Sequence, residues 1–205
     1  MKLLIATRNP GKQREARRLL ERAGIEVVFP DEAGVLESPE EEALELHDSL
    51  LANARAKAVH FCRATGLPTV GDDSGLEVFS LGGEPGVRSR RWAGSTGSRP
   101  EIDAANNAYL MRRLLGAPPN QRRARYRCVL VLLPKPGGVP EAFEGGCTGR
   151  ITEEPRGTGG FGYDPYFLSD ELGKTFGEAT AEEKDAVSHR GRAFRALAEA
   201  LAAKS

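Results

Sequence analysis

The acidic stretch Gly71-Asp72-Asp73-Ser74-Gly75 places the tightest constraint on how this chain can fold. It lies between two short apolar runs, residues 67–70 and 76–79, and its position indicates the end of a strand. Adjacent carboxylates repel each other unless a cation offsets the repulsion, and Mg²⁺ commonly does so through carboxylate oxygens. The same residue types are also typical of a solvated Asx-type turn. Taken alone the stretch favours the turn, so the metal interpretation depends on the rest of the chain.

The composition indicates a globular protein with a substantial core. Of the 205 residues, 40% are apolar and 28% are charged, and we expect one domain over residues 1–205 that can be bilobed. Lys plus Arg equals Asp plus Glu at 29 each, which argues against nucleic-acid and membrane partners. Three widely spaced cysteines (Cys62, Cys128 and Cys147) and an N-terminal apolar run too short for a signal segment predict a reduced, cytoplasmic chain.

Hydrophobic periodicity predicts an α/β fold. The apolar run at 125–133 is the strongest strand signal and is expected to be central in a sheet, and glycines 145–146 are expected to interrupt its neighbour. Asn9 with Pro10, Ser98 with Pro100, and Thr180 with Glu183 are predicted helix starts. Strands are predicted over 3–6, 25–29, 67–70, 125–133 and 142–151, and helices over 10–23, 48–64, 98–115 and 180–201, the last interrupted at 188–191.

The loop after the first predicted strand has residue types that are typical of an anion-binding site. It brings a hydroxyl, an amide and an ammonium to a helix N-terminus, whose free N–H groups and dipole favour negative charge. The candidate residues are Thr7, Arg8, Asn9, Pro10, Gly11 and Lys12. The spacing is not that of a Walker A loop. The alternative is simple capping by Asn9 with Lys12 in solvent.

A second glycine-rich loop spans residues 157–165. Its glycines fit G-x-G-x-x-G, but Pro165 pushes Asp164 away from helical geometry, so the context is wrong for a dinucleotide fingerprint. The loop better suits a planar ring stacked on Phe161, with Asp164 accepting from ring N–H groups. A flexible surface loop is the alternative.

The block Ser188-His189-Arg190-Gly191 sets a hydroxyl, an imidazole and a guanidinium side by side at a helix break. A serine-hydrolase triad is weakly supported, because Ser74 lies in no G-x-S-x-G elbow. A donor cluster that faces a ligand carbonyl fits these side chains better. The alternatives are a structural histidine and a solvated arginine.

Taken together, these blocks closely resemble the inosine/xanthosine triphosphate pyrophosphatase (ITPase-like) family, which acts on non-canonical purine nucleoside triphosphates. The resemblance covers essentially the whole chain. It rests on Thr7-x-Asn9-x-x-Lys12, Asn53-Ala54-x-x-Lys57-Ala58, Asp72-Asp73-Ser74-Gly75-Leu76, Pro85-Gly86-Val87-x-Ser89, residues 157–165, Glu183-Lys184 and Ser188-His189-Arg190-Gly191, in this order.

The resemblance implies hydrolysis of ITP, dITP and XTP to the monophosphate and pyrophosphate, with Mg²⁺. It implies a homodimer whose subunits have an elongated mixed sheet flanked by helices, with the active-site cleft between two lobes. Asp73 would be the general base and, with Glu45, a metal ligand, while Asp72 stays open between a second metal ligand and structural support. Substrate contacts would come from Thr7, Arg8, Asn9, Pro10, Gly11, Lys12, Ser74, Phe161, Gly162, Tyr163, Asp164, Lys184, His189 and Arg190.

Three other functions remain alternatives at this point. The first is a house-cleaning pyrophosphatase for modified pyrimidine triphosphates, and the second is a nucleotide-binding regulator without turnover. The third is a nucleic-acid-binding protein that uses a local patch of Arg88, Arg90, Arg91 and Trp92, which the zero net charge disfavours.

Overall fold

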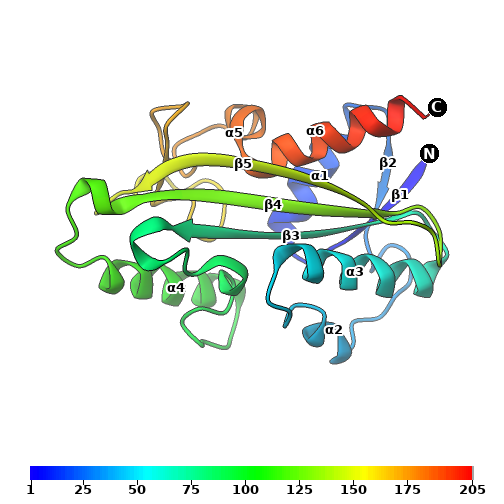
Figure 1. The fold of residues 1–205 in the computed structure, drawn as a ribbon, viewed down its shortest axis with the longest axis horizontal. Coiled ribbons are helices and arrows are strands. Elements are labelled where there is room, and N and C mark those ends of the chain that lie inside the picture. Colours follow the sequence, from blue (N-terminus) through cyan, green and yellow to red (C-terminus); the bar gives the residue numbers. More distant parts are fainter. Residues whose placement is uncertain (205) are drawn as a thin grey trace. The chain divides into compact units, whose positions relative to one another are not determined.

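The computed structural model describes residues 1–204 and shows an α/β protein (Figure 1). The strands are β1 (Lys2–Ala6), β2 (Glu26–Val28), β3 (Thr69–Val78), β4 (Arg123–Leu133), β5 (Glu141–Ile151) and β6 (Phe167–Ser169). The α-helices are α1 (Pro10–Glu21), α2 (Glu40–Ala43), α3 (Leu50–Thr65), α4 (Arg99–Arg113), α5 (Ala181–Val187) and α6 (His189–Ala202). Short 3₁₀ turns are η1 (Phe79–Leu81), η2 (Gly86–Arg88) and η3 (Pro119–Arg122).

The strands form one six-stranded mixed sheet in the order β2-β1-β3-β4-β5-β6. Strand β1 pairs in parallel with both β2 and β3, whereas β5 and β6 are antiparallel. The predicted α/β class with a mixed sheet is confirmed, and β4 is an internal strand as its apolar sequence indicated. The predicted interruption of β5 at glycines 145–146 is wrong, because the strand continues through both residues.

The chain divides into two compact units. Among the described residues, the first contains 1–73, 128–145 and 190–204, and the second contains 74–127 and 146–189. Strands β3, β4 and β5 each contribute residues to both units. The chain therefore passes from one unit to the other at Asp73–Ser74 and again at His189–Arg190, inside two of the motifs singled out from the sequence.

In the first unit, side chains alternate between the two faces of the sheet, as strand geometry requires. Leu3 and Ile5 of β1 belong to a core cluster with residues of α1 and α6, whereas Leu4 and Ala6 pack with Phe61 of α3. Helices α1 and α6 therefore cover one face of this part of the sheet and α3 covers the other (Figure 1).

The second unit has a separate core. Its buried residues come from the second halves of β3 and β5, from the first half of β4, from α4 and from the segment around β6. They include Leu76, Leu110, Tyr126, Cys147 and Phe167. Tyr126 and Phe167 pack with their ring centroids 4.7 Å apart.

The predicted starts of three helices are confirmed, because each has capping residues within its first turn. Asn9 caps α1 with Pro10 at its first position, Ser98 and Glu101 form a capping box on α4, and Thr180 and Glu183 form another on α5. The predicted interruption at 188–191 is confirmed at Ser188, which is extended between α5 and α6, and is wrong for residues 189–191, which form the first turn of α6. Within residues 1–204, the helices are too short or too polar to cross a membrane.

Candidate active site

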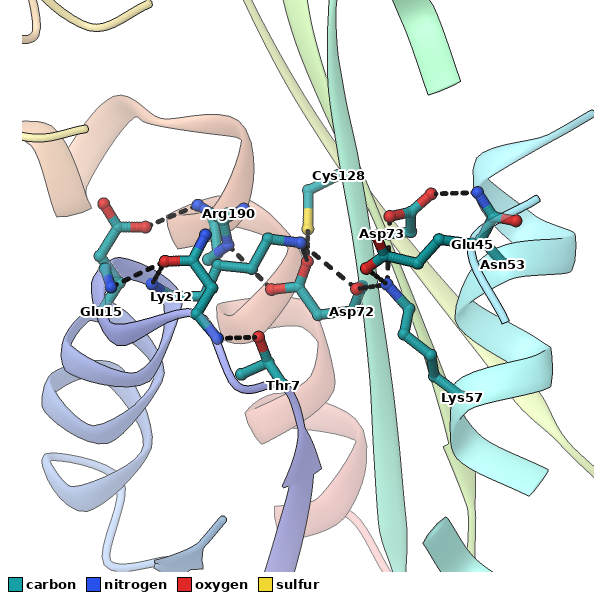
Figure 2. Close-up of polar contacts among 12 residues, drawn as sticks. Thr7, Lys12, Glu15, Glu45, Asn53, Lys57, Asp72, Asp73, Cys128 and Arg190 are labelled. Carbon is teal, nitrogen blue, oxygen red and sulfur yellow. Dashed lines mark hydrogen bonds and ion pairs between the residues drawn. The ribbon is translucent and has the colours of Figure 1, made fainter. Parts of the chain in front are cut away.

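The two adjacent aspartates lie within a strand and point to opposite faces of it (Figure 2). Asp72 shares the face of β3 that carries Val70, toward α1 and α6, while Asp73 faces α3. Both carboxylates are buried, at 0% and 8% exposure. The strand-end and turn interpretations of this stretch are therefore wrong, and direct repulsion between paired side chains is relieved by strand alternation.

The glycines that flank the pair permit close backbone approaches. A Cβ at Gly71 would lie 1.8 Å from the carbonyl oxygen of Ala54, so glycine lets α3 pack directly on β3. A Cβ at Gly75 would lie 2.2 Å from the carbonyl oxygen of Gly86 within the second unit. Glycine is therefore needed at both positions for close packing of the backbone and not for a turn.

Asp72 forms the centre of a buried ionic network. Its Oδ1 lies 2.8 Å from Lys12 Nζ, and its Oδ2 accepts from Arg190 Nε at 2.9 Å. Arg190 Nη1 donates in turn to Glu15 Oε2 at 2.6 Å. Burial alone would raise the pKa of Asp72, but the charges of Arg190 and Lys12 outweigh it and hold this pKa well below its usual range. Because both carboxylate oxygens of Asp72 are already paired with cationic side chains, the structure favours structural support over metal ligation for Asp72.

Asp73 is held from α3. Asn53 Nδ2 donates to Asp73 Oδ2 at 2.9 Å, and Lys57 Nζ donates to Asp73 Oδ1 at 3.1 Å. Lys57 also lies 3.4 Å from Glu45 Oε1 and donates to the Asp72 carbonyl at 2.6 Å. Burial alone would lower the pKa of Lys57, but the Asp73 and Glu45 carboxylates outweigh it and raise this pKa. One ammonium thus joins the two predicted metal ligands.

The donor set around Asp73 suits a hard divalent cation. Within residues 1–204, no three His, Cys, Asp or Glu side chains gather into a metal site of their own. Mg²⁺ is typically bound through one or two carboxylates, with waters and substrate phosphates supplying the remaining oxygens. The two carboxylates of Asp73 and Glu45, which already share the Lys57 ammonium, meet that requirement.

The first loop is organised by its own side chains. Thr7 Oγ1 accepts from the Asn9 backbone N–H at 3.2 Å, and Asn9 Oδ1 accepts from the N–H groups of Gly11 and Lys12 at 2.9 and 3.4 Å. Asn9 therefore caps α1, as the simpler alternative held. Lys12 is not in solvent, however, because its ammonium is paired with Asp72.

The guanidinium of Arg8, a candidate substrate contact, is held by acidic side chains. Its Nε and Nη2 form a bidentate pair with Glu41, at 2.7 Å each, and it also pairs with Asp31. Nη2 donates further to the Val35 carbonyl at 3.0 Å. Arg8 thus ties the first loop to the acidic segment that carries α2.

In the second unit, Asp164 and Lys184 form a buried ion pair with a distance of 2.5 Å. The same Asp164 oxygen accepts from the backbone N–H of Phe161 at 2.8 Å, and the Lys184 ammonium lies 4.9 Å from the centroid of the Phe161 ring. Asp164 therefore fixes the aromatic end of the glycine-rich loop, which favours a positioning role over direct contact with a ring N–H.

Helix α4 holds the same loop end. Asp103 accepts from the Gly162 N–H, and Asn107 donates to the Gly162 carbonyl, both at 2.9 Å. The buried Tyr163 donates its hydroxyl to the Ser89 carbonyl at 2.8 Å. The alternative of a flexible surface loop is wrong for this end, because backbone and side chains are both held.

His189 and Arg190 are both buried, at 3% and 1% exposure, so the alternative of a solvated arginine is wrong. The His189 ring stacks on Tyr126 with centroids 4.6 Å apart, and its Nδ1 lies 3.9 Å from Cys147 Sγ. Arg190 Nε and Nη1 are engaged by Asp72 and Glu15, which favours a positioning role over recognition of a base. Ser74 is half-buried in β3.

Among the residues that shape the site, Lys57 was expected from the resemblance to add positive charge around the transferred group, and the others were given no role from sequence. Asn53 and Lys57 lie four apart and so share one face of α3, a spacing that could have paired them. Glu15 adjoins the apolar stripe of α1 three residues after Lys12, which was a signal for a buried charge. Asp103, Asn107 and Cys147 gave no local signal, because only the fold brings them to the site.

Comparison with known proteins gives full-length matches. The model of the Ham1 family matches residues 3–200. A dITP/XTP pyrophosphatase of Thermus thermophilus is 47% identical over 200 residues, covering 98% of this chain and 91% of the relative. One of Frankia alni is 46% identical over 205 residues, covering 98% and 97%. The structure of a HAM1 protein from Coxiella burnetii has a TM-score of 0.84 at 33% identity and covers 98% of each chain.

Proposed function

This chain belongs to the Ham1 family, and we propose that it is a nucleoside-triphosphate pyrophosphatase for the non-canonical purine nucleotides dITP, XTP and ITP. Its products would be the nucleoside monophosphate and pyrophosphate. Relatives that are 46–47% identical bear the name dITP/XTP pyrophosphatase. The observation that carries the proposal is the buried Asp73 carboxylate, which Asn53 and Lys57 hold beside the Glu45 carboxylate.

Asp73 and Glu45 would hold Mg²⁺ together with oxygens of the triphosphate. When bound, the ion supplies positive charge that stabilises the leaving pyrophosphate. The choice of Mg²⁺ over softer metals is supported by the donor set, which consists of carboxylate oxygens.

The chain's own residues would act on the attacking water and on the phosphate charge. Asp73 would orient a water molecule and take its proton while the water oxygen bonds to the α-phosphorus. The bond from the α-phosphorus to the α–β bridging oxygen would break, and pyrophosphate would leave with that electron pair. Lys12 and Lys57 would add positive charge around the transferred group, and the α1 N-terminus would orient phosphate oxygens.

The second unit would recognise the base. Phe161, fixed by Asp164 and Lys184, would stack on the purine, and His189 would donate to its 6-keto oxygen. Adenine carries an amino group at that position and would leave the buried donor unpaired. We assign Arg190 a supporting role, since it holds Asp72. A homodimeric state is proposed from the family resemblance, and a cytoplasmic location from the three widely spaced cysteines.

The proposal is tested by incubating the purified protein with ITP, dITP, XTP, dUTP, GTP and ATP in the presence of Mg²⁺. We expect the monophosphate and pyrophosphate from ITP, dITP and XTP, at higher kcat/KM than from ATP or GTP. Orthophosphate with a diphosphate product would contradict α–β cleavage. A preference for dUTP would favour the pyrimidine alternative, and tight binding without turnover would favour a regulator.

Replacing His189 with phenylalanine should reduce base selectivity. The phenyl ring keeps the stack on Tyr126 but lacks both ring nitrogens. We expect the ratio of kcat/KM for ITP to that for ATP to fall about tenfold, as for the loss of one buried hydrogen bond. The matched control is His60→Phe, at a half-buried histidine of α3, which should leave the ratio unchanged. An unchanged ratio in His189→Phe would remove His189 from base recognition.

A further inference from the structure

We propose that Asn53 is a positioning residue that fixes the Asp73 carboxylate and the segment bearing Glu45 in one arrangement. This inference rests on the proposed function for its purpose, because it assigns Asn53 to the metal site formed by those two carboxylates. Asn53 is 1% exposed and lies in the first turn of α3.

The Asn53 amide makes one contact with each side of the proposed site. Nδ2 donates to Asp73 Oδ2 at 2.9 Å, and Oδ1 accepts from the backbone N–H of His47 at 3.0 Å. A primary amide offers a donor at one end and an acceptor at the other. A carboxylate could not make the first contact, and an apolar side chain could make neither.

On the Asp73 side, the hydrogen bond from Asn53 fixes the orientation of the carboxylate together with Lys57. Lys57 engages Oδ1 and Asn53 engages Oδ2, so both oxygens have a donor and rotation of the group is opposed. Each carboxylate oxygen has a second lone pair, so acceptor capacity remains for a cation or a water. A carboxylate held in this way is preorganised for a ligand.

On the other side, the contact holds the end of a segment that is mostly at the surface. None of the four residues of helix α2, all described by the structure, is buried, and Leu44, between α2 and Glu45, is partly buried against the core cluster of Leu4 and Phe61. Arg8 pairs with Glu41 at the start of the segment, and Asn53 accepts from His47 at its end. The packing of Leu44 and the polar contacts at both ends of the segment therefore together hold Glu45 in place, and of these only the Asn53 contact also reaches Asp73.

The test compares Asn53→Leu with a matched control, Asn106→Leu. Asn106 of α4 is also buried, at 3% exposure, and its amide also donates to one group, the Arg90 carbonyl, and accepts from another, the Ala93 N–H. The two substitutions therefore remove the same chemistry from similar surroundings. Only the first removes it from the proposed metal site.

The main readout is Mn²⁺ affinity, measured by electron paramagnetic resonance with the protein alone and with an α,β-methylene analogue of ITP. We expect Asn53→Leu to weaken Mn²⁺ binding about 10- to 100-fold, the usual effect of losing a group that orients a metal ligand. The Mg²⁺ concentration that half-saturates ITP hydrolysis should rise in parallel, while KM for ITP at saturating Mg²⁺ stays within about twofold. Asn106→Leu should lower the thermal midpoint without changing either metal constant.

The proposal would be overturned if Asn53→Leu kept the wild-type Mn²⁺ affinity, or if both variants lost Mn²⁺ affinity equally. It would also be overturned if the wild-type protein bound no Mn²⁺ with or without the ITP analogue. If Asn53→Leu does not fold, Asn53→Ala serves with the same expectations, since its cavity admits water to both orphaned groups. The proposed function fails separately, when wild-type protein releases no pyrophosphate from ITP, dITP or XTP. In that case the Mn²⁺ comparison still decides the role of Asn53.

Discussion

Replacing Asp73 with asparagine is expected to lower kcat for ITP about 10²- to 10⁴-fold, the usual contribution of a general base. Asparagine has the same shape but cannot take a proton from water, and it is a weaker metal ligand. Whichever way the new amide is oriented, its NH₂ group meets a donor, either Lys57 Nζ or Asn53 Nδ2. We therefore also expect a loss of about 1–3 kcal/mol in the free energy of unfolding.

The activity effect must be separated from the stability effect. Single-turnover rates with ITP, measured well below the unfolding midpoint of the variant, report chemistry on folded protein. Asp170→Asn serves as a control, because Asp170 is a surface carboxylate that pairs with Arg123 and should leave turnover unchanged. A residual rate in Asp73→Asn within tenfold of wild type would remove Asp73 as the base.

The sequence indicated Asp73 as the candidate base but did not predict its structural setting. Gly and Asp are poor strand formers, so the Gly71–Gly75 stretch was interpreted as a strand end or a turn. In the structure it continues β3, and glycine is required at both positions because α3 and the Gly86 backbone approach too closely for a Cβ. Tertiary packing thus overrides local propensity here, and no local pattern in this stretch records that packing.

Features with short-range causes were predictable. The starts of α1, α4 and α5 follow from capping residues within one turn of each helix, and the internal position of β4 follows from its continuous apolar run. The partners of buried charges were not predictable. Arg190 pairs with Glu15, 175 positions away, and although the place of Glu15 beside the apolar stripe of α1 indicated a buried charge, the sequence did not indicate its partner.

We expect the second large effect, a loss of stability, when the buried charge pairs of Arg190 are removed. Replacing Arg190 with methionine is expected to lower the free energy of unfolding by about 3–5 kcal/mol, the usual cost of removing one partner of a buried ion pair. Methionine fills much of the space of the arginine stem but leaves Asp72 and Glu15 without this cation. Lys12 still compensates Asp72 in part, so we expect Glu15→Gln in the Arg190→Met background to recover some of the loss. Urea unfolding of the single and double variants measures both quantities.

The matched control is Arg123→Met, which removes an equally well-formed but exposed pair. Arg123 contacts both oxygens of Asp170, at 2.7 and 2.9 Å, with side-chain exposures of 41% and 35% for the two partners. Exposed pairs contribute about 0–1 kcal/mol, because water solvates each charge once the other is removed. Equal losses in Arg190→Met and Arg123→Met would mean that the buried network does not depend on Arg190 to compensate its carboxylates. A several-fold larger loss of unfolding free energy in Arg190→Met would instead show that β3 depends on the charges of Glu15 in α1 and Arg190 in α6. Because Asp72 immediately precedes Asp73 in β3, the same charges would then support the strand that carries the candidate base.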